Sequence, residues 1–294
     1  MIYLLFSILS SASLIILFKL FDKFSVKTSH AIVINYLVAA LLSFYLDDSG
    51  LQTSEAIYQP WFLSALILGT LFIVSFNIIA ISISKIGIAV TTVANKMSLI
   101  IPVIFSIFFL KDSINAIKIA GIFVALIAVY LTSKNENKSG IDSKYAAFPL
   151  IVFISSGFID TFFKYNEEYT LGDNGLRPFL SWIFLTAGII GLITLILDCI
   201  NKKPLPNFKA LLGGIALGIP NYFSLYFLMK TISLPNIEGS VIFPVNNMSI
   251  VAVTALSGIL LFKEKLSRVN LYGIFLCIIA IGMIAFSEKM MFLF

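Results

Sequence analysis

Long runs of apolar residues recur along the whole chain, and short polar connections separate them. Runs of about 18 or more apolar residues are typical of helices that cross a lipid bilayer. The pattern therefore predicts an all-α membrane protein with ten transmembrane helices. The predicted spans cover residues 1–19, 30–46, 60–83, 87–110, 115–132, 145–163, 178–198, 210–230, 238–262 and 269–287.

The longest polar connection lies almost at the midpoint of the chain, at residues 133–144, and leaves five predicted spans on each side. We therefore expect two five-helix halves. The first half covers residues 1–132, residues 133–144 are a polar linker, and the second half covers residues 145–294.

The two halves resemble each other in sequence. The segment "FFLKDSINAIKIAGIFVALIAVYL" (108–131) aligns with "LLFKEKLSRVNLYGIFLCIIAIGMI" (260–284), and "NKMS" (95–98) matches "NNMS" (246–249). Because each half has an odd number of helices, the second half must enter the membrane from the opposite side. Such inverted-topology repeats are characteristic of secondary transporters, whose substrate site lies near the bilayer midplane at the repeat interface.

Composition agrees with a chain that is mostly embedded in lipid, because 59% of the residues are hydrophobic and only 12% are charged. Soluble domains carry about 25% charged residues. The lysines are dispersed rather than gathered on one face, which argues against a nucleic-acid partner. Cys199 and Cys277 form neither a disulfide framework nor a metal-binding spacing, so we expect no metal site and no cofactor.

The distribution of positive charge predicts an orientation, since cytoplasmic loops are enriched in lysine and arginine. Of the 20 lysines and arginines, thirteen fall in the predicted connections on one side, six fall on the other, and Lys96 lies between them. Both termini are therefore expected outside. Of the 20 basic residues only Arg177 and Arg268 are arginines, and the rest are lysines. This bias toward lysine indicates an AT-rich bacterial genome. We therefore expect the protein in the bacterial inner membrane.

One charge interrupts the fourth predicted span. Lys96 follows Asn95 in the middle of an apolar run that Lys85 and Lys111 bracket. These two lysines are 11 and 15 residues away, or about 16 and 22 Å along a helix, so Lys96 cannot reach either headgroup layer. Ionisable residues inside a membrane are functional by default. Lys96 is expected to hold an anionic substrate group or to titrate during transport; the alternative is a structural ion pair or bonds to backbone carbonyls.

Amides and tyrosines elsewhere suggest the rest of a binding site. Asn246 and Asn247 match Asn95 in depth, and Tyr222 and Tyr226 lie one turn apart. Pro220 precedes these tyrosines and frees a backbone carbonyl, a feature of broken helices that line cavities. The alternative for each amide is a helix–helix hydrogen bond, and for each tyrosine ordinary packing. The predicted substrate-binding residues are Lys96, Asn95, Asn77, Asn246, Asn247, Asn221, Tyr222 and Tyr226.

Two acidic residues lie near predicted helix ends. Asp160 is placed in the last turns of the sixth span, four residues before Lys164, and Glu238 at the outer end of the ninth. For each of them one interpretation is a structural role at the membrane interface, as an ion pair or as an outer gate. The alternative is that the carboxylate carries a proton during transport. Gly214 and Gly218 form a GxxxG pair, which predicts close packing of the eighth predicted helix.

The end of each half carries an acidic residue nine positions before a glycine: Asp112 before Gly121, and Glu264 before Gly273. With ten helices in two halves, the chain resembles the drug/metabolite transporter superfamily, EamA type. It departs from that family at Asp112, where glutamate is usual. The resemblance implies a carrier of small metabolites, often amino acids or related compounds, and not an ATPase.

The expected function is a secondary transporter that moves a small polar metabolite, an amino acid or related compound with an anionic group, across the inner membrane by alternating access. A sugar or phosphorylated-metabolite exchanger of the same fold is the alternative. A membrane-embedded enzyme and a channel are less favoured, because the chain has a single histidine and no ring of charges. The expected partners are a small-molecule substrate, the lipid bilayer and a proton as candidate coupling ion, in a monomer.

Overall fold

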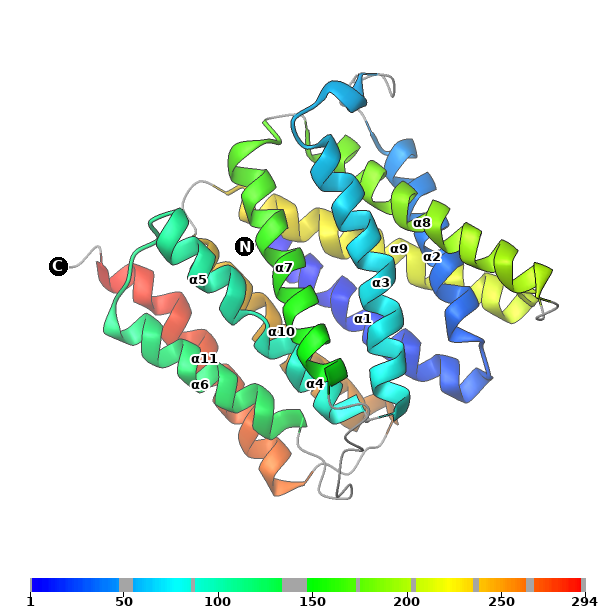
Figure 1. The fold of residues 1–294 in the computed structure, drawn as a ribbon. Helices are drawn as coiled ribbons and strands as arrows, with labels where there is room; N and C mark the ends of the chain where they lie inside the picture. The colour runs from blue at the N-terminus through cyan, green and yellow to red at the C-terminus, as the bar shows by residue number, and fades with distance from the viewer. Residues whose placement is uncertain are drawn as a thin grey trace. The chain divides into compact units, whose positions relative to one another are not determined.

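The computed structural model describes residues 2–47, 55–85, 88–133, 147–172, 175–201, 205–234, 238–262 and 267–291. These residues are helical with short connections, and Figure 1 shows no strand among them. The elements are α1 (Ile2–Phe24), α2 (Thr28–Tyr45), η1 (Ala56–Tyr58), α3 (Phe62–Lys85), α4 (Ile88–Met97), α5 (Ile100–Phe109), α6 (Ala116–Ser133), α7 (Ala147–Tyr169), α8 (Leu176–Ile200), α9 (Phe208–Ile232), α10 (Gly239–Phe262) and α11 (Arg268–Met291).

Every predicted span overlaps a helix of the structure, and the all-α prediction is confirmed for the described residues. Seven helices there are long and apolar enough to cross a membrane: α1, α2, α3, α7, α8, α9 and α10. Three shorter apolar stretches accompany them, at Ala94–Phe109, Ala116–Leu131 and Arg268–Ile284. These features are consistent with an integral membrane protein, while the number of ten crossings stays a prediction.

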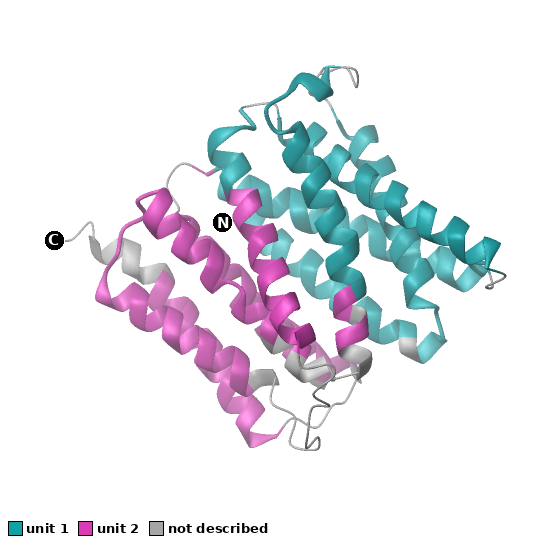
Figure 2. Cartoon of the chain, viewed as in Figure 1, with its two compact units in different colours: residues 1–77, 165–233 teal, residues 78–164, 234–294 magenta. Residues whose placement is uncertain are grey.

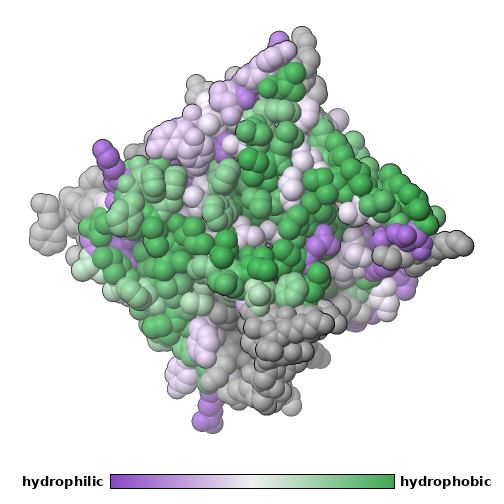
Figure 3. Space-filling model, in the orientation of Figure 1, coloured by the Kyte–Doolittle hydropathy of each residue, from purple (hydrophilic) through white to green (hydrophobic). Residues whose placement is uncertain are grey.

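Large apolar side chains point outward from these helices. On the face drawn in Figure 3, hydrophobic residues cover much of the described surface. Leu41 is 71% exposed and Phe108 is 75% exposed, and both belong to helices rather than to connections. Contiguous apolar surface of this extent is unusual in a soluble monomer, and it is the surface that contact with lipid requires.

The chain divides into two compact units (Figure 2). Unit 1 contains Met1–Asn77 and Tyr165–Ser233, and unit 2 contains Ile78–Lys164 and Leu234–Phe294. Each unit therefore takes helices from both halves of the sequence. This division differs from the predicted pair of repeats, which stays a prediction.

In unit 1, α2 packs against α8 and α9, and α9 also packs against α1. Glycines bring α9 close to α2. A Cβ atom on Gly214 would lie 2.5 Å from the side chain of Ile34, and one on Gly218 would lie 2.8 Å from the carbonyl oxygen of Asn35. The GxxxG pair thus allows two backbones to approach, and the predicted close packing of this helix is confirmed.

In unit 2, α11 packs along α6, and α10 packs against α5, α6 and α11. Gly121, a glycine of the family-like motif, lies where a Cβ atom would be 2.7 Å from the side chain of Ile284 on α11. The starts of α6 and α11 are capped alike, at aligned positions of the two halves. The Asn115 side chain accepts the backbone N–H of Lys118 at 2.7 Å, and the Ser267 hydroxyl accepts that of Asn270 at 3.2 Å.

The fourth predicted span is not one continuous helix, which corrects the prediction. The structure ends α4 at Met97 and begins α5 at Ile100. Pro102 has no N–H to donate to the Ser98 carbonyl, and its ring crowds that carbonyl. Ile101 donates to the Ser98 carbonyl instead at 3.0 Å, and Leu99 donates to Lys96 at 3.4 Å, so the turn tightens.

The Ser98 hydroxyl completes this break by donating to the Asn95 carbonyl at 2.5 Å. That carbonyl would otherwise accept the Leu99 N–H in a continuous α-helix. At Pro220, where the sequence suggested a broken helix, α9 continues through the proline from Phe208 to Ile232. Of these two prolines, Pro102 therefore follows an interruption of the helix, and Pro220 does not interrupt its helix.

Replacing Gly218 by Ala should destabilise the protein by about 1–3 kcal/mol, because the added methyl group meets the backbone of α2. The matched control is Gly282→Ala on α11, where a Cβ atom would have nothing within 4 Å. That change should stabilise the protein by about 0.5–1 kcal/mol, since alanine favours helix over glycine. Thermal unfolding followed by circular dichroism in detergent measures both, and equal effects of the two substitutions would contradict the close packing.

Candidate functional site

Lys96 lies in the last turn of α4, directly before the break. Its ammonium donates a hydrogen bond to the side-chain oxygen of Asn247 on α10 at 3.0 Å. The Asn247 amide nitrogen in turn donates to the Phe243 carbonyl at 3.1 Å, which turns its oxygen toward Lys96. The structure thus joins two predicted site residues that are 151 positions apart in the sequence.

Asn95 connects α4 to α7. Its side-chain nitrogen donates to the hydroxyl of Ser156 at 2.8 Å. Asp160 lies four residues after Ser156 and so on the same face of α7. Because Asn95 precedes Lys96 and contacts Ser156, Asp160 lies on the side of α7 that is turned toward the end of α4. Lys96, Asn95, Asn247 and Asp160 therefore form one polar cluster in unit 2, which we call the Lys96 cluster.

The place of Asp160 in its helix differs from the prediction. The sixth span was expected to end at residue 163, with Asp160 in its last turns, but α7 continues to Tyr169. Asp160 is thus nine residues before the end of the helix, or about 13 Å. It lies one turn after Ser156, on the face of α7 that contacts Asn95. The charged residues after position 163 conceal this extension from a hydropathy pattern, although they favour helix.

The Lys96 cluster has unused hydrogen-bonding capacity. An ammonium group carries three donors, and among the described residues Lys96 uses one, on Asn247. The carboxylate of Asp160 accepts no hydrogen bond from the described part of the chain. Lys96 and Asp160 are both half-buried. Asn246 is buried beside Asn247 on α10.

The other predicted binding residues belong to unit 1. Asn221 donates to the side-chain oxygen of Asn35 at 3.1 Å, and so joins α9 to α2. Asn77 donates to the Ile73 carbonyl of its own helix at 2.7 Å. Asn221 thus makes the helix–helix hydrogen bond of the structural alternative, and the role of both amides in substrate binding stays a prediction.

Tyr222 and Tyr226 stack with ring centroids 5.8 Å apart, so their predicted common face is confirmed. Tyr222 is buried, and the hydroxyl of Tyr226 accepts a hydrogen bond from Arg177 at 3.4 Å. The guanidinium of Arg177 also lies over the Tyr226 ring, 5.7 Å from its centroid. Sequence reasoning used Arg177 only for topology. Its chemical signal was that it is one of two arginines in a chain that otherwise uses lysine.

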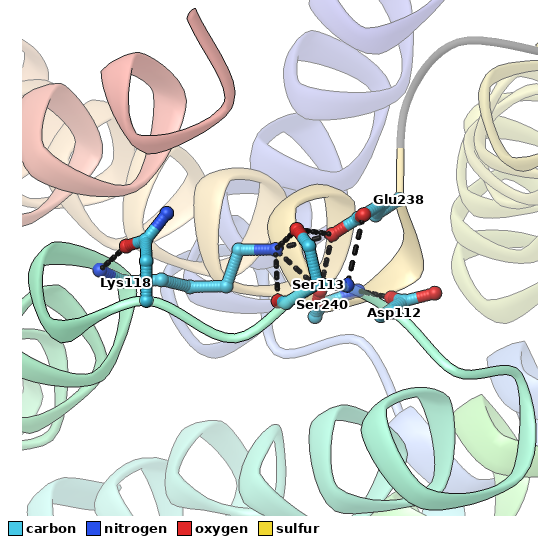
Figure 4. A network of polar contacts seen from close by, with 6 residues as sticks. Asp112, Ser113, Lys118, Glu238 and Ser240 are labelled. Carbon is cyan, nitrogen blue, oxygen red and sulfur yellow. Dashed lines mark hydrogen bonds and ion pairs between the residues drawn. The ribbon is translucent and has the colours of Figure 1, made fainter. Parts of the chain in front are cut away.

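Glu238 belongs to a second polar cluster in unit 2, the Glu238 network (Figure 4). Its carboxylate forms an ion pair with Lys118 and accepts the backbone N–H and the hydroxyl of Ser113, both at 2.9 Å. Lys118 is only 1% exposed and also donates to the Ser113 carbonyl at 2.9 Å and to the Ser240 hydroxyl at 3.1 Å. Among the predicted roles of Glu238, this geometry matches an ion pair.

Asp112 joins the Glu238 network by accepting the backbone N–H of Ser240 at 2.8 Å. Asp112 and Glu238 thus place two carboxylates at the N-terminus of α10, where the helix dipole favours negative charge. The network fastens the turn before α6 to the start of α10. Sequence reasoning missed Lys118, which was counted as a loop lysine; the signal was its place in the first turn of an apolar helix.

Bonding in this network lowers the pKa of Glu238. Burial of the carboxyl raises its pKa, but the hydrogen bonds from Lys118 and Ser113 outweigh burial and hold it below the usual value of 4.5. Glu238 lies just before the first residue of α10. A carboxyl held below its usual pKa remains charged at neutral pH, so the ion pair with Lys118 is intact there.

Comparisons with known proteins support the fold more than the function. No model of a known protein family matches the chain. An uncharacterized protein of Haemophilus influenzae is 27% identical over 296 residues, which cover 97% of this chain and 98% of that protein. A crystal structure of another protein matches with a TM-score of 0.80 and 12% identity, covering 99% of this chain and 97% of that one. At 12% identity the match shows a shared fold alone, and membership of the drug/metabolite transporter superfamily stays a prediction.

The Glu238 network should make stability depend on pH. A carboxyl whose folded-state pKa is lowered contributes stability that is present above 4.5 and is lost as pH falls through the lowered value. Glu238→Gln should therefore reduce the melting temperature at pH 7, because Lys118 loses its counter-charge, at a cost of about 3–5 kcal/mol. The difference between wild type and variant should shrink as the pH falls below 4.5 toward the lowered pKa of Glu238.

Melting temperatures between pH 3.5 and 7 test this prediction. Glu168→Gln is the control, because it removes an exposed carboxylate from α7 and should show a small difference at every pH. A wild-type advantage over Glu238→Gln that persists unchanged to the lowest pH would show that the ion pair is not its source.

Proposed function

We propose that this protein is a secondary carrier for a small polar metabolite with an anionic group, and that Lys96 holds that group. The observation that carries the proposal is the state of the Lys96 ammonium. It lies in the interior of an apolar run, with one bond to Asn247 and two donors unused among the described residues. A lysine at such depth costs about 2.5–3.5 kcal/mol on insertion scales, and a bound anion offsets that cost.

The break between α4 and α5 supports this role. In transporters, interrupted helices near the midplane supply substrate and ion sites, and irregular backbone at membrane depth is tolerated where it is buried in protein or lines a cavity. Lys96 and Asn95 are in the last turn before the break, and Pro102 explains why the break is there. Lys96, the amides of Asn95 and Asn247, and the break in the helix together form a polar surface. Close packing of apolar helices would not need such a surface, which supports a role in binding.

We further propose alternating access by two inverted five-helix repeats in the bacterial inner membrane, with both termini outside and a proton as candidate coupling ion. The similarly capped starts of α6 and α11 support the repeat, since Asn115 and Ser267 occupy aligned positions. The excess of lysine and arginine in the connections on one side, thirteen of 20 against six, supports the orientation.

Substitution of Lys96 tests the carrier. In proteoliposomes, Lys96→Met should reduce uptake of a ¹⁴C-labelled mixture of the common amino acids by about 100-fold, because the anionic group loses its charged partner. Lys96→Arg should restore little, since a planar guanidinium does not imitate a compact ammonium. Lys23→Gln, at an exposed lysine of α1, is the control and should transport normally.

Melting temperatures separate loss of function from loss of fold in the same samples. A Lys96→Met protein that unfolds at the wild-type temperature and transports at the wild-type rate would exclude Lys96 from the site. If labelled glucose 6-phosphate is taken up in a Lys96-dependent way and amino acids are not, the alternative exchanger is correct.

Fusions to the C-terminus test the orientation. With that end outside, a fused alkaline phosphatase should be active and a fused green fluorescent protein dark in the same bacterial host. The reverse pattern would overturn the orientation and leave the helical fold unaffected.

A further inference from the structure

We infer that the Lys96 cluster binds a zwitterion, with the substrate carboxylate on Lys96 and the substrate ammonium on Asp160. The inference rests on the proposed function and adds the charge class that the site selects. It assigns to Asp160 a direct role in holding substrate, in place of the interfacial pair, the gate or the proton carrier that the sequence suggested.

The first support is the matched pair of unfilled groups. Lys96 has two N–H donors that no described residue accepts, and Asp160 has carboxylate oxygens to which no described residue donates. The contact between Asn95 and Ser156 brings the two charged residues to the same side of α7, and no ion pair within 4 Å joins them among the described residues. A ligand that carries both an acceptor and a donor can bond to Lys96 and to Asp160 at the same time. A simple anion can bond only to Lys96, and a simple cation only to Asp160.

The second support is the packing of α7 against α4 and α5 beside Asp160. Asn95 on α4 bonds to Ser156 on α7, and Asp160 is one turn further along the same face. Gly157 lets α7 approach α5, because a Cβ atom there would lie 2.3 Å from the side chain of Ile101. Ser156 and Gly157 thus fix the rotation of α7, and the carboxylate position follows from two contacts that do not involve charge.

The third support is charge balance in a medium of low dielectric. An anion bound to Lys96 alone would leave Asp160 beside a second negative charge, and a cation bound to Asp160 would do the same to Lys96. Uncompensated charges in a protein interior are strongly destabilising. A zwitterion gives each group a new partner and leaves the total charge of the cluster unchanged. A phosphate dianion, by contrast, would face one cation and one carboxylate.

The contrast with Lys118 separates a binding pair from a structural one. Lys118 and Glu238 are also opposite charges in unit 2, but Ser113 and Ser240 occupy their remaining bonding positions. No ligand atom is needed there. The Lys96 cluster is the charged pair of this unit that the described residues leave incomplete.

Matched probes test the charge class in purified protein. Each common amino acid is compared at 10 mM with its deaminated carboxylic acid and its decarboxylated amine, with the rise in melting temperature as the readout. We expect at least one amino acid to stabilise the wild type while its acid and its amine do not. Asp160→Asn should weaken that amino acid by about tenfold to hundredfold and should make the corresponding acid bind better than it does to the wild type.

Two further variants keep the test independent of folding. Lys96→Met alone leaves the Asp160 carboxylate without a nearby positive charge, which can itself destabilise the protein. The double variant K96M/D160N removes both charges and leaves the cluster neutral. It should bind none of the three probes. Glu168→Gln on the same helix is the control and should behave as the wild type does.

The inference is wrong if an acid stabilises the wild type as well as its amino acid does, if Asp160→Asn leaves the preference unchanged, or if no amino acid binds. The first two outcomes leave the carrier intact, because Lys96 then binds an anion without Asp160. Wild-type-like binding and uptake by K96M/D160N would overturn the proposed site itself.

Discussion

A lysine in the middle of an apolar run imposes one constraint on the rest of unit 2: its charge has to be met inside the protein. Lys96 lies 11 and 15 residues from the lysines that bracket this run, so apolar residues surround it in the sequence on both sides. Near Lys96 the structure places an amide from α10, a carboxylate from α7 and a break in the helix that carries Lys96. These features come from three separate segments of the chain, so the packing of α4, α7 and α10 has to be compatible with them.

Unit 2 contains two buried or half-buried lysines that lie near a carboxylate, and they differ in how many of their donors are bonded. Lys118 is almost fully buried and bonds to Glu238, Ser113 and Ser240, so the pair is closed and fastens the start of α10 to the turn before α6. Lys96 is half-buried and has a single hydrogen bond among the described residues. A charged pair whose bonding positions are all filled suits a permanent structural contact. A charged pair with unfilled positions suits the reversible binding of a ligand. Both lysines act on α10, one at its first turn and one near Asn247.

Amides within the helices show why residue type alone does not assign a role. Asn221 and Asn247 both lie on long apolar helices. Asn221 is engaged with Asn35 across the close contact that Gly214 and Gly218 permit, so it stabilises the packing of two helices. Asn247 is turned toward a cation by its bond to Phe243. The difference lies in what the neighbouring helix presents, and no local pattern contains that information.

The sequence by itself determined the helical nature of the chain, the apolar surface, the approximate helix positions and the place of Lys96 inside an apolar run, because hydrophobic periodicity and run length are local properties. It also determined that the helix carrying Gly214 and Gly218 packs closely. Only the tertiary structure decided that α7 continues past Asp160, that Asn95 and Ser156 bring α4 and α7 together beside Asp160, and that Glu238 pairs with Lys118. These outcomes depend on which side chains distant in sequence meet in a medium where a polar group without water must find its partner within the protein.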